Sequence, residues 1–237
     1  MNLDLYKHIY LLGIGGIGMS ALARYFNAHG KKVSGYDKCK TTLTKKLEKE
    51  GIVIHYKDDV SQISDEIKEA KSSELLVIYT PAIDEHNTEF HFLKEKGIIP
   101  LKRSKVLGMI TRQSFTIAIA GTHGKTTTAA LLTHILKNSE IDCTAFLGGV
   151  SKDFNNNMVL SKKGNIVIVE ADEYDHSFHH LYPDIAVITS IDKDHLDIYE
   201  NKKSLETAFQ KFASQVKQKG FLLVHAGVQT ELEKPED

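Results

Sequence analysis

The segment Ala120–Thr128 reads Ala-Gly-Thr-His-Gly-Lys-Thr-Thr-Thr, a combination of residue types that commonly binds phosphate. An apolar run, Phe115–Ile119, precedes it, and a helix-like run, Ala129–Leu136, follows it. A strand, a glycine turn and a helix in this order direct backbone N–H groups and the positive end of the helix towards an anion. The lysine adds charge, and a threonine hydroxyl can bind Mg²⁺. The segment therefore predicts a site for a nucleoside triphosphate.

One residue departs from the strict Walker A pattern. Ile119 stands five positions before Gly124, where that pattern has glycine, so the turn is the shorter Gly-Thr-His-Gly-Lys-Thr form. A Gly-Lys-Thr sequence often arises by chance, and the flanking strand and helix favour the functional interpretation here.

A second glycine turn, Gly13–Gly18, reads Gly-Ile-Gly-Gly-Ile-Gly between a predicted strand and a predicted helix. This is G-x-G-x-x-G in the context that the motif requires, and Asp37 follows about twenty residues later, where dinucleotide enzymes place a ribose-binding carboxylate. The turn predicts a ligand with a diphosphate, of which NAD is only one example. Thr80 to Ala82 follow the fourth predicted strand, at the edge where open α/β sheets bind ligands. A packing turn at Gly13–Gly18 and an ordinary proline turn at Thr80 to Ala82 are the alternatives.

Acidic residues and a histidine follow two further apolar runs. Ile166–Val169 leads into Glu170, and Ile185–Thr189 leads towards Asp194 and His195. Since the carboxyl ends of parallel strands share one edge, these groups are expected beside the phosphate turn, where oxygen ligands suit Mg²⁺. Glu170 is the best candidate ligand. A solvated acidic turn and an ordinary surface or core histidine are the alternatives.

The composition is that of a globular protein: 237 residues, 41% hydrophobic, 26% charged, with a formal net charge of −1. The balance suggests neither nucleic acid nor a membrane surface as a partner, and the oligomeric state stays open. Cys39 and Cys143 form no CxxC motif, which fits a reduced compartment. No signal peptide or membrane-length apolar run is found in the sequence, so we expect a cytoplasmic protein.

Short β-rich runs alternate with helical runs and indicate an α/β fold. The pattern restarts at the phosphate turn, which predicts two consecutive doubly wound, mostly parallel sheets, in a Rossmann-like domain (residues 1–107) and a P-loop-like domain (108–237). The predicted strands are Ile9–Leu12, Lys32–Gly35, Val53–His55, Leu75–Tyr79, Ile98–Pro100, Phe115–Ala120, Thr144–Leu147, Ile166–Val169, Ile185–Thr189 and Phe221–Val224. The predicted helices include Met19–His29, Thr42–Glu50 and Thr128–Asn138.

Taken together, three blocks resemble the Mur ligase family. They are Gly13–Ser20, Gly121–Thr128, and the pair Glu170–Asp175 (Glu-Ala-Asp-Glu-Tyr-Asp) with Asp194–Asp197 (Asp-His-Leu-Asp). The first block favours the members that add L-alanine over those that recycle murein tripeptide. Many members also have a histidine in the loop after the third strand. In this chain that stretch reads His-Tyr-Lys-Asp at His55–Asp58, and its histidine is the last residue of the predicted strand.

The resemblance implies a first domain that binds the UDP portion of UDP-N-acetylmuramate, a second that binds ATP and Mg²⁺, and a third that closes over both. We expect this chain to hold the first and part of the second, to lack the third, and to be inactive as a ligase alone. The implied reaction joins L-alanine to the lactyl carboxylate of UDP-N-acetylmuramate through an acyl phosphate, without a covalent enzyme intermediate.

The resemblance also assigns roles to residues. Those implied to bind ATP are Gly121, Thr122, His123, Gly124, Lys125, Thr126 and Thr127. Those implied to bind the UDP-sugar are Gly13, Gly15, Gly16, Ile17, Gly18, Asp37, Thr80, Ala82 and His123. Lys125 would contact the β- and γ-phosphates, Thr126 a first Mg²⁺, and Glu170 with His195 a second. The implied catalytic residues are Lys125, Glu170 and His195.

Other classes of protein remain as alternatives. An NAD-dependent dehydrogenase would explain the first glycine turn but neither the second phosphate turn nor the acids. A non-catalytic nucleotide-binding module and a tripeptide-recycling ligase of the same family stay open. A histidine-rich metal protein is disfavoured, because the cluster His176–His180 has no partner at recognisable ligand spacing and fits a solvated loop better.

Overall fold

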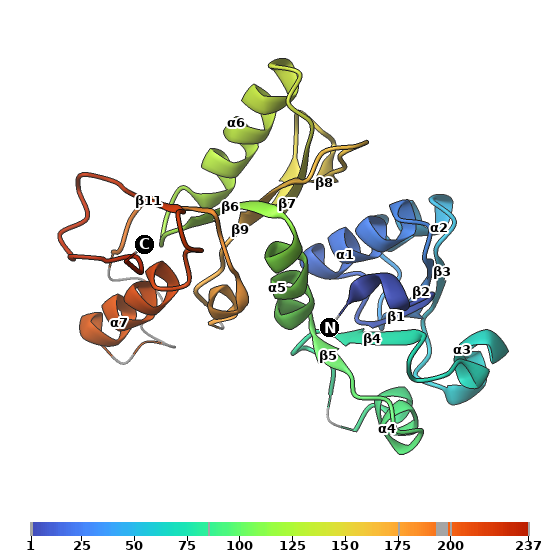
Figure 1. The fold of residues 1–237 in the computed structure, drawn as a ribbon. Helices are drawn as coiled ribbons and strands as arrows, with labels where there is room; N and C mark the ends of the chain where they lie inside the picture. Colours follow the sequence, from blue (N-terminus) through green and yellow to red (C-terminus); the bar gives the residue numbers. More distant parts are fainter. Residues whose placement is uncertain (1, 85, 175, 193–198, 200, 237) are drawn as a thin grey trace. The chain divides into compact units, whose positions relative to one another are not determined.

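The computed structural model describes all residues except 1, 85, 175, 193–198, 200 and 237. The chain divides into two compact units, residues 1–106 and 107–237. Each contains a mostly parallel sheet with helices, as Figure 1 shows. The predicted fold class is therefore confirmed, and the two units are described in turn.

The first unit is built on a five-stranded sheet in the order β3-β2-β1-β4-β5. All its strand pairs are parallel. The strands are β1 (His8–Leu12), β2 (Lys32–Tyr36), β3 (Val53–His55), β4 (Leu75–Tyr79) and β5 (Leu101–Lys102). The helices are α1 (Ile17–Ala28), α2 (Thr42–Lys49), α3 (Asp65–Glu69) and α4 (Thr88–Glu95), with short 3₁₀ turns η1 (Leu3–Leu5) and η2 (Val60–Gln62).

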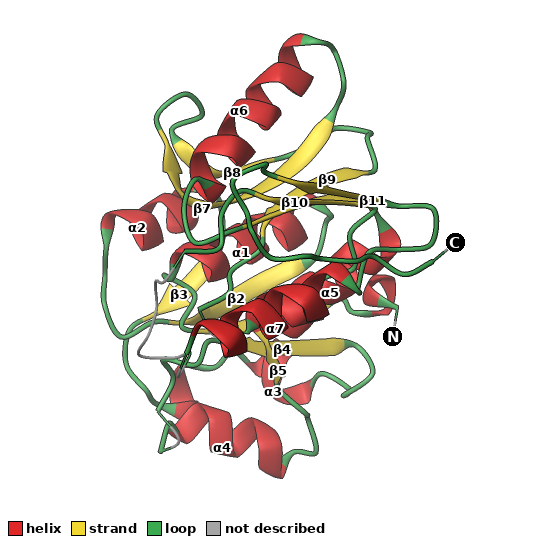
Figure 2. Cartoon of the chain, turned by 90° about the vertical axis from the view of Figure 1, so that its left-hand side faces the viewer, coloured by secondary structure: helices red, strands yellow, loops and turns green. Residues whose placement is uncertain are grey.

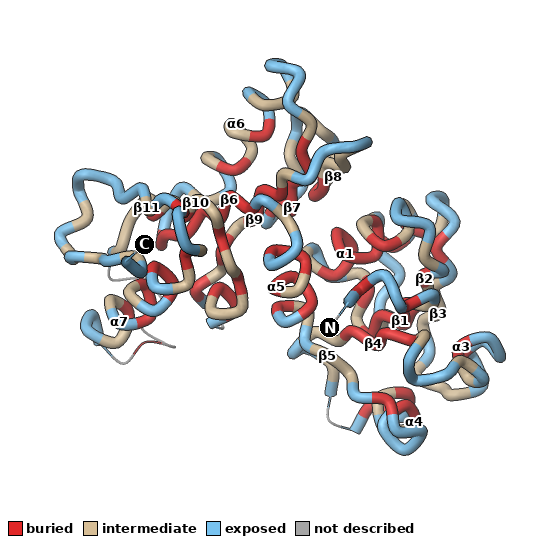
Figure 3. Tube along the Cα trace, viewed as in Figure 1, coloured by how far each residue is buried: buried red, intermediate tan, exposed pale blue. Residues whose placement is uncertain are grey.

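The centre of this sheet is apolar on both faces, as a parallel sheet covered by helices requires. Residues 9–12 of β1 and 75–78 of β4 are buried, which Figure 3 shows as red stretches. The helices that follow begin at polar caps: Thr41 and Thr44 form a capping box at α2, and Asn87 accepts from Phe90 N at α4. These caps fix where the loops at the carboxyl edge end.

The second unit is built on a six-stranded sheet in the order β11-β10-β6-β9-β7-β8. Its strands are β6 (Phe115–Ala120), β7 (Cys143–Ser151), β8 (Asn156–Val159), β9 (Ile166–Glu170), β10 (Ile185–Ile188) and β11 (Phe221–Val224). The helices are α5 (Arg103–Gln113), which contains the boundary between the units, α6 (Lys125–Asn138) and α7 (Lys202–Ala213), with a 3₁₀ turn η3 (Ser177–His180).

Helix α6 contacts β6, β7 and β9, and Figure 2 shows it beside the sheet that contains β7 and β9. Between them lies a core of small and branched side chains, which includes Ile119, Ala129, Ala145 and Ile168. This packing holds the first turn of α6 at the carboxyl end of β6, the position needed for a phosphate turn.

Several strands differ by one residue from the predicted bounds, and β7 continues to Ser151, beyond the predicted end at Leu147. Two strands differ more. The fifth strand is Leu101–Lys102 instead of Ile98–Pro100, because Pro100 has no N–H to donate to a ladder. Strand β8 was not predicted, since its polar start, Asn156-Asn157, lacks a strand pattern; it pairs antiparallel with β7 as a hairpin. Helix α6 begins three residues before the predicted Thr128, directly after Gly124.

Candidate nucleotide-binding sites

The phosphate turn follows β6 and depends on two glycines with positive φ. Gly121 has φ +140° and Gly124 has φ +83°, conformations that residues with a Cβ rarely adopt. A Cβ on Gly121 would lie 2.1 Å from the Thr189 hydroxyl oxygen. Gly124 caps α6 without a side-chain hydrogen bond, so the first N–H groups of that helix face the turn. This backbone is suited to an anion.

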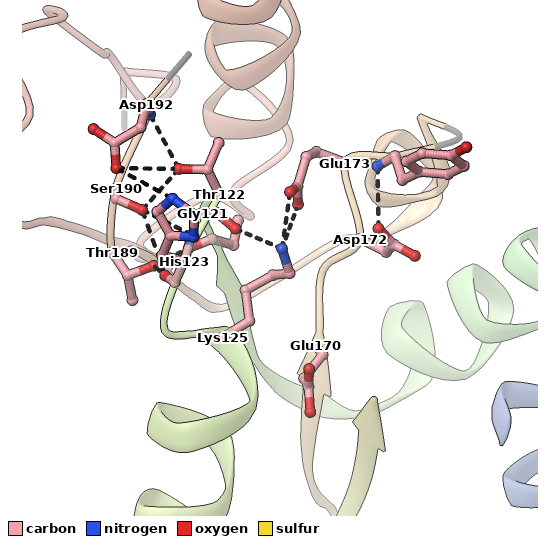
Figure 4. A network of polar contacts seen from close by, with 12 residues as sticks. Gly121, Thr122, His123, Lys125, Glu170, Asp172, Glu173, Thr189, Ser190 and Asp192 are labelled. Carbon is pink, nitrogen blue, oxygen red and sulfur yellow. Dashed lines mark hydrogen bonds and ion pairs between the residues drawn. The ribbon is translucent and has the colours of Figure 1, made fainter. Parts of the chain in front are cut away.

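Strand β10 and the residues after it support the turn from the side. Thr122 N donates to Ser190 O at 3.1 Å, and Asp192 N donates to the Thr122 hydroxyl at 3.0 Å. His123 N donates to the Ser190 hydroxyl at 2.9 Å, while the Thr189 hydroxyl donates to His123 O at 2.5 Å. Figure 4 shows these residues gathered around Thr122 and His123. Ser190 was missed as a site residue, because the sequence carries no sign of this contact.

Lys125 points away from that group and towards Glu173, also shown in Figure 4. Its Nζ atom lies 2.8 and 2.9 Å from the two carboxylate oxygens of Glu173 and 2.6 Å from Gly121 O. The Glu173 side chain is fully buried and that of Lys125 is 18% exposed. Sequence reasoning missed Glu173; its only signal was its place in the acidic block after β9.

Glu170, the last residue of β9, contacts Thr126 in the first turn of α6. The Thr126 hydroxyl donates to Glu170 Oε2 at 2.8 Å, and Gly148 N donates to Oε1 at 2.5 Å. Burial raises the pKa of Glu170 above its usual value, although both hydrogen bonds and nearby Lys125 act in the opposite direction. The structure thus brings the two predicted metal ligands into direct contact.

The Thr126–Glu170 pair fits Mg²⁺, because both donors are hard oxygens and a protein commonly supplies only one or two ligands to a nucleotide-bound Mg²⁺. Within the described part of the chain, no group of three or more His, Cys, Asp or Glu side chains is arranged to hold a metal ion. His195, the third predicted ligand, lies outside the described residues, as does Asp194.

The first glycine turn has a comparable design in the other unit. Gly13 has φ +82°, and its N–H and that of Ile14 donate to Tyr36 O at 2.8 and 3.0 Å. Gly15 N donates to Asp37 Oδ2 at 2.7 Å, and Gly16 caps α1 without a side-chain hydrogen bond. The carboxylate predicted near the ribose therefore contacts the glycine turn itself.

A cavity of about 650 Å³ lies against this turn. Most of the residues predicted to bind the UDP-sugar line it: Gly13, Gly15, Gly16, Asp37, Thr80 and Ala82. Tyr36, Asp58 and Asn87 line it too, although they were not predicted from the sequence. Ile17 and Gly18 do not line it. They lie in the first turn of α1, where a Cβ on Gly18 would stand 2.8 Å from Arg103 Nη1.

His55 opens the stretch in which many family members have a loop histidine, and here its side chain makes contacts within the fold. Its Nε2 atom lies 2.6 Å from Oε1 of the fully buried Glu89, which also accepts from the Tyr10 hydroxyl at 2.6 Å. Asp58 lines the cavity and accepts from the Thr88 hydroxyl at 2.6 Å. His55 thus positions the loop before Asp58, and it does not line the cavity.

The histidine cluster differs from the predicted solvated loop. Phe178 is fully buried and stacks on Phe212 with ring centroids 5.2 Å apart. His179 Nε2 lies 3.0 Å from Ala208 O, and burial lowers the pKa of His179. The cluster therefore packs η3 against α7, a structural role.

Two family models match this chain. Residues 8–115 match the model described as "Mur ligase family, catalytic domain", and residues 119–234 match "Mur ligase middle domain". The chain belongs to the Mur ligase family.

Individual relatives carry more specific names than the family models. UDP-N-acetylmuramate–L-alanine ligase of Parabacteroides distasonis is 47% identical over 228 residues, and that of Christiangramia forsetii 48% over 227. Each alignment covers 96% of this chain but 49% and 50% of the relative, so the chain spans about half the length of the curated relatives it matches.

Among solved structures, UDP-N-acetylmuramate-alanine ligase from Thermotoga maritima matches with a TM-score of 0.79 at 29% identity, covering 94% of this chain and 50% of that one. A ligase from Neisseria meningitides, named for UDP-N-acetylmuramate and L-alanyl-γ-D-glutamyl-meso-diaminopimelate, matches with a TM-score of 0.81 at 27% identity, covering 95% and 73%.

No helix among the described residues is both long and apolar enough to cross a membrane.

Proposed function

We propose that this chain supplies the UDP-sugar-binding and ATP-binding parts of a ligase that joins L-alanine to UDP-N-acetylmuramate in the cytoplasm. The observation that carries the proposal is the arrangement of Lys125, Thr126 and Glu170 at one glycine turn, in a chain 47% identical to a ligase of that name. The cavity at Gly15 and Asp37 supports a nucleotide-sugar site in the other unit.

The chemistry requires activation of a carboxylate, because hydroxide is a poor leaving group from a carboxylic acid. The lactyl carboxylate attacks the γ-phosphorus of ATP, and the bond to the ADP oxygen breaks to give an acyl phosphate. The amine of L-alanine then attacks the acyl carbon, phosphate leaves, and the amine loses a proton. Such a transfer depends mainly on positioning and charge neutralisation.

The residues of the second unit suit those two tasks. The backbone N–H groups at the start of α6 would hold the phosphates, and Lys125 would neutralise charge on the β- and γ-phosphates. Thr126 and Glu170 would hold Mg²⁺, which neutralises phosphate charge when bound. Glu170, together with His195, is also proposed to contact a second Mg²⁺.

The residues of the first unit suit the nucleotide sugar. Gly13, Gly15 and Gly16 line the cavity, and the first turn of α1, with Ile17 and Gly18, offers N–H groups to a diphosphate. We propose that Asp37 lies near the uridine and that Thr80 and Ala82 flank the ligand. His123, whose Nε2 lies 3.9 Å from Asp192, is proposed to contact substrate.

A calorimetric titration of the purified chain with UDP-N-acetylmuramate, MgATP and NAD in parallel tests the proposal. We expect the first two to bind and NAD not to bind. Lys125→Ala should abolish MgATP binding and leave UDP-N-acetylmuramate binding intact. Binding of NAD, or unchanged MgATP affinity in that variant, would contradict the proposal.

A further inference from the structure

The three N–H donors of the Lys125 ammonium all have acceptors within the protein. A lysine ammonium has three N–H groups, and Nζ lies within hydrogen-bond distance of three acceptors. These are Gly121 O at 2.6 Å and the two oxygens of Glu173 at 2.8 and 2.9 Å. A phosphate oxygen can therefore bind Lys125 only by replacing one of these acceptors.

Hydrogen bonds to its backbone carbonyl hold Glu173 in place. Its carbonyl oxygen accepts from the hydroxyl of the buried Tyr199 at 2.6 Å and from His176 N at 3.1 Å. Its side chain is fully buried, so the carboxylate depends on nearby donors in place of water. The Lys125–Glu173 contact is therefore a buried ion pair. An ion pair on the surface would be weaker, because water would compete for both groups.

We propose that Glu173 takes, in the ligand-free protein, the position at Lys125 that a β- or γ-phosphate oxygen takes when nucleotide binds. This inference rests on the proposed function, because it assumes that the turn binds ATP. Glu173 is then a positioning residue: it keeps the lysine extended towards Gly121, and it competes with the phosphate for the ammonium.

The proposal predicts that a substitution in the site increases the affinity for phosphate. Removing the charge of Glu173 while keeping its shape should free Lys125 and strengthen phosphate binding. If Glu173 had only a structural role, the same substitution would loosen the turn and weaken the binding of every nucleotide.

The test is calorimetry of the chain and its Glu173→Gln variant with ADP, pyrophosphate and AMP. We expect ADP and pyrophosphate to bind about tenfold more tightly to the variant, the effect of removing one competing charge-assisted hydrogen bond. AMP, which lacks a β-phosphate, should bind equally to both proteins. Unchanged or weaker binding of ADP in Glu173→Gln would overturn the proposal.

Two further variants keep the result interpretable. Asp184→Asn removes the acidic partner of Lys217, 2.8 Å from it in the same unit, and should leave ADP affinity unchanged. Glu173→Asp withdraws the carboxylate but keeps its charge, and it carries the test if Glu173→Gln does not fold: a gain smaller than tenfold supports competition, and no gain refutes it. If the unaltered chain binds no ADP, the proposed function fails instead.

Discussion

The Thr126 hydroxyl donates to Glu170 across 2.8 Å, which joins the first turn of α6 to the end of β9. Both groups are oxygen ligands that suit a cation, and here the hydroxyl of Thr126 donates to the carboxylate of Glu170. Burial at the same time raises the pKa of Glu170. The pair therefore holds a carboxylate that is costly to ionise until a positive charge arrives.

Glu170→Gln should separate metal binding from folding. We expect the affinity for MgATP to fall at least about tenfold, because an amide is a much poorer Mg²⁺ ligand than a carboxylate. Affinity for ADP without Mg²⁺ should change little. Calorimetry with and without Mg²⁺ checks this, with Asp153→Asn, an exposed acid in the β7–β8 turn, as the control. Equal loss with and without Mg²⁺ would contradict the assignment.

The same variant should be slightly more stable in the absence of ligand. A carboxyl whose folded pKa is raised favours folding while protonated and opposes it once ionised at higher pH. Near neutral pH the neutral amide avoids that cost, so we expect the Tm of Glu170→Gln to rise by about 1–3 °C. The gain should disappear as the pH falls towards the usual glutamate pKa. A lower Tm at neutral pH would show that the two hydrogen bonds outweigh the burial.

Asp142 should make the second unit sensitive to acid. Its Oδ2 accepts from the backbone N–H groups of Lys162 and Lys163 at 2.6 and 2.8 Å and from the Ser161 hydroxyl at 2.7 Å. These hydrogen bonds, that to Lys163 above all, and nearby Lys137 hold its pKa well below the usual range. Because the folded pKa is lowered, the stabilisation is present above the unfolded pKa and is lost as the pH falls through the folded one.

We therefore expect Asp142→Ala to lower the Tm at pH 7 by about 3–6 °C and to flatten the dependence of Tm on pH below about 4. Calorimetric melts between pH 7 and pH 2 measure both effects. An equal drop in Tm at every pH would mean that the side chain acts through packing and not through its charge.

Gly15→Ala should damage the first site alone. A Cβ there would lie 2.8 Å from Asp37 Oδ2 and 2.7 Å from Thr44 Cγ2, closer than side chains tolerate. Affinity for UDP should fall at least about tenfold, since the shift breaks the Gly15–Asp37 hydrogen bond and moves the turn. MgATP affinity should stay unchanged. Gly149→Ala, where a Cβ meets no atom within 4 Å, is the matched control and should leave UDP binding as it is.

Tyr10→Phe should weaken the folding of the first unit. The Tyr10 hydroxyl donates to the buried Glu89 at 2.6 Å, and burial, with nearby Glu89, raises the pKa of Tyr10. Loss of that donor leaves a buried carboxylate less satisfied, at a cost of about 1–3 kcal/mol in free energy of unfolding. Urea denaturation measures it. Tyr6→Phe, which removes a hydroxyl without a hydrogen-bond partner among the described residues, should cost no more than about 0.5 kcal/mol.

Local sequence was enough for the fold class and for the two glycine turns. Strands such as Leu75–Tyr79 and Phe115–Ala120 were predicted at their observed bounds, because each is a continuous apolar run with polar or turn-forming residues on both sides. The position of Glu170 beside the phosphate turn followed from one rule, that parallel strands end at a shared edge.

The parts that were missed depend on distant contacts. Glu173 and Ser190 acquire their partners, Lys125 and His123, only through folding. The acidic block after β9 did not single out Glu173 among its acids, and no motif selected Ser190. Strand β8 is formed by the pairing of a hairpin, not by its own polar sequence. The roles of individual site residues stay predictions until ligands are titrated.

The close packing of Gly121 against the Thr189 hydroxyl means that the nine-residue phosphate motif depends on a second segment of the chain. Its complement, Thr189, stands 68 positions along the chain, at the end of the apolar run Ile185–Thr189. Grafting the motif alone into another scaffold would transfer the positive-φ glycines without the strand end that packs against Gly121. Engineering a nucleotide site from this fold would thus require both segments to be moved as one piece.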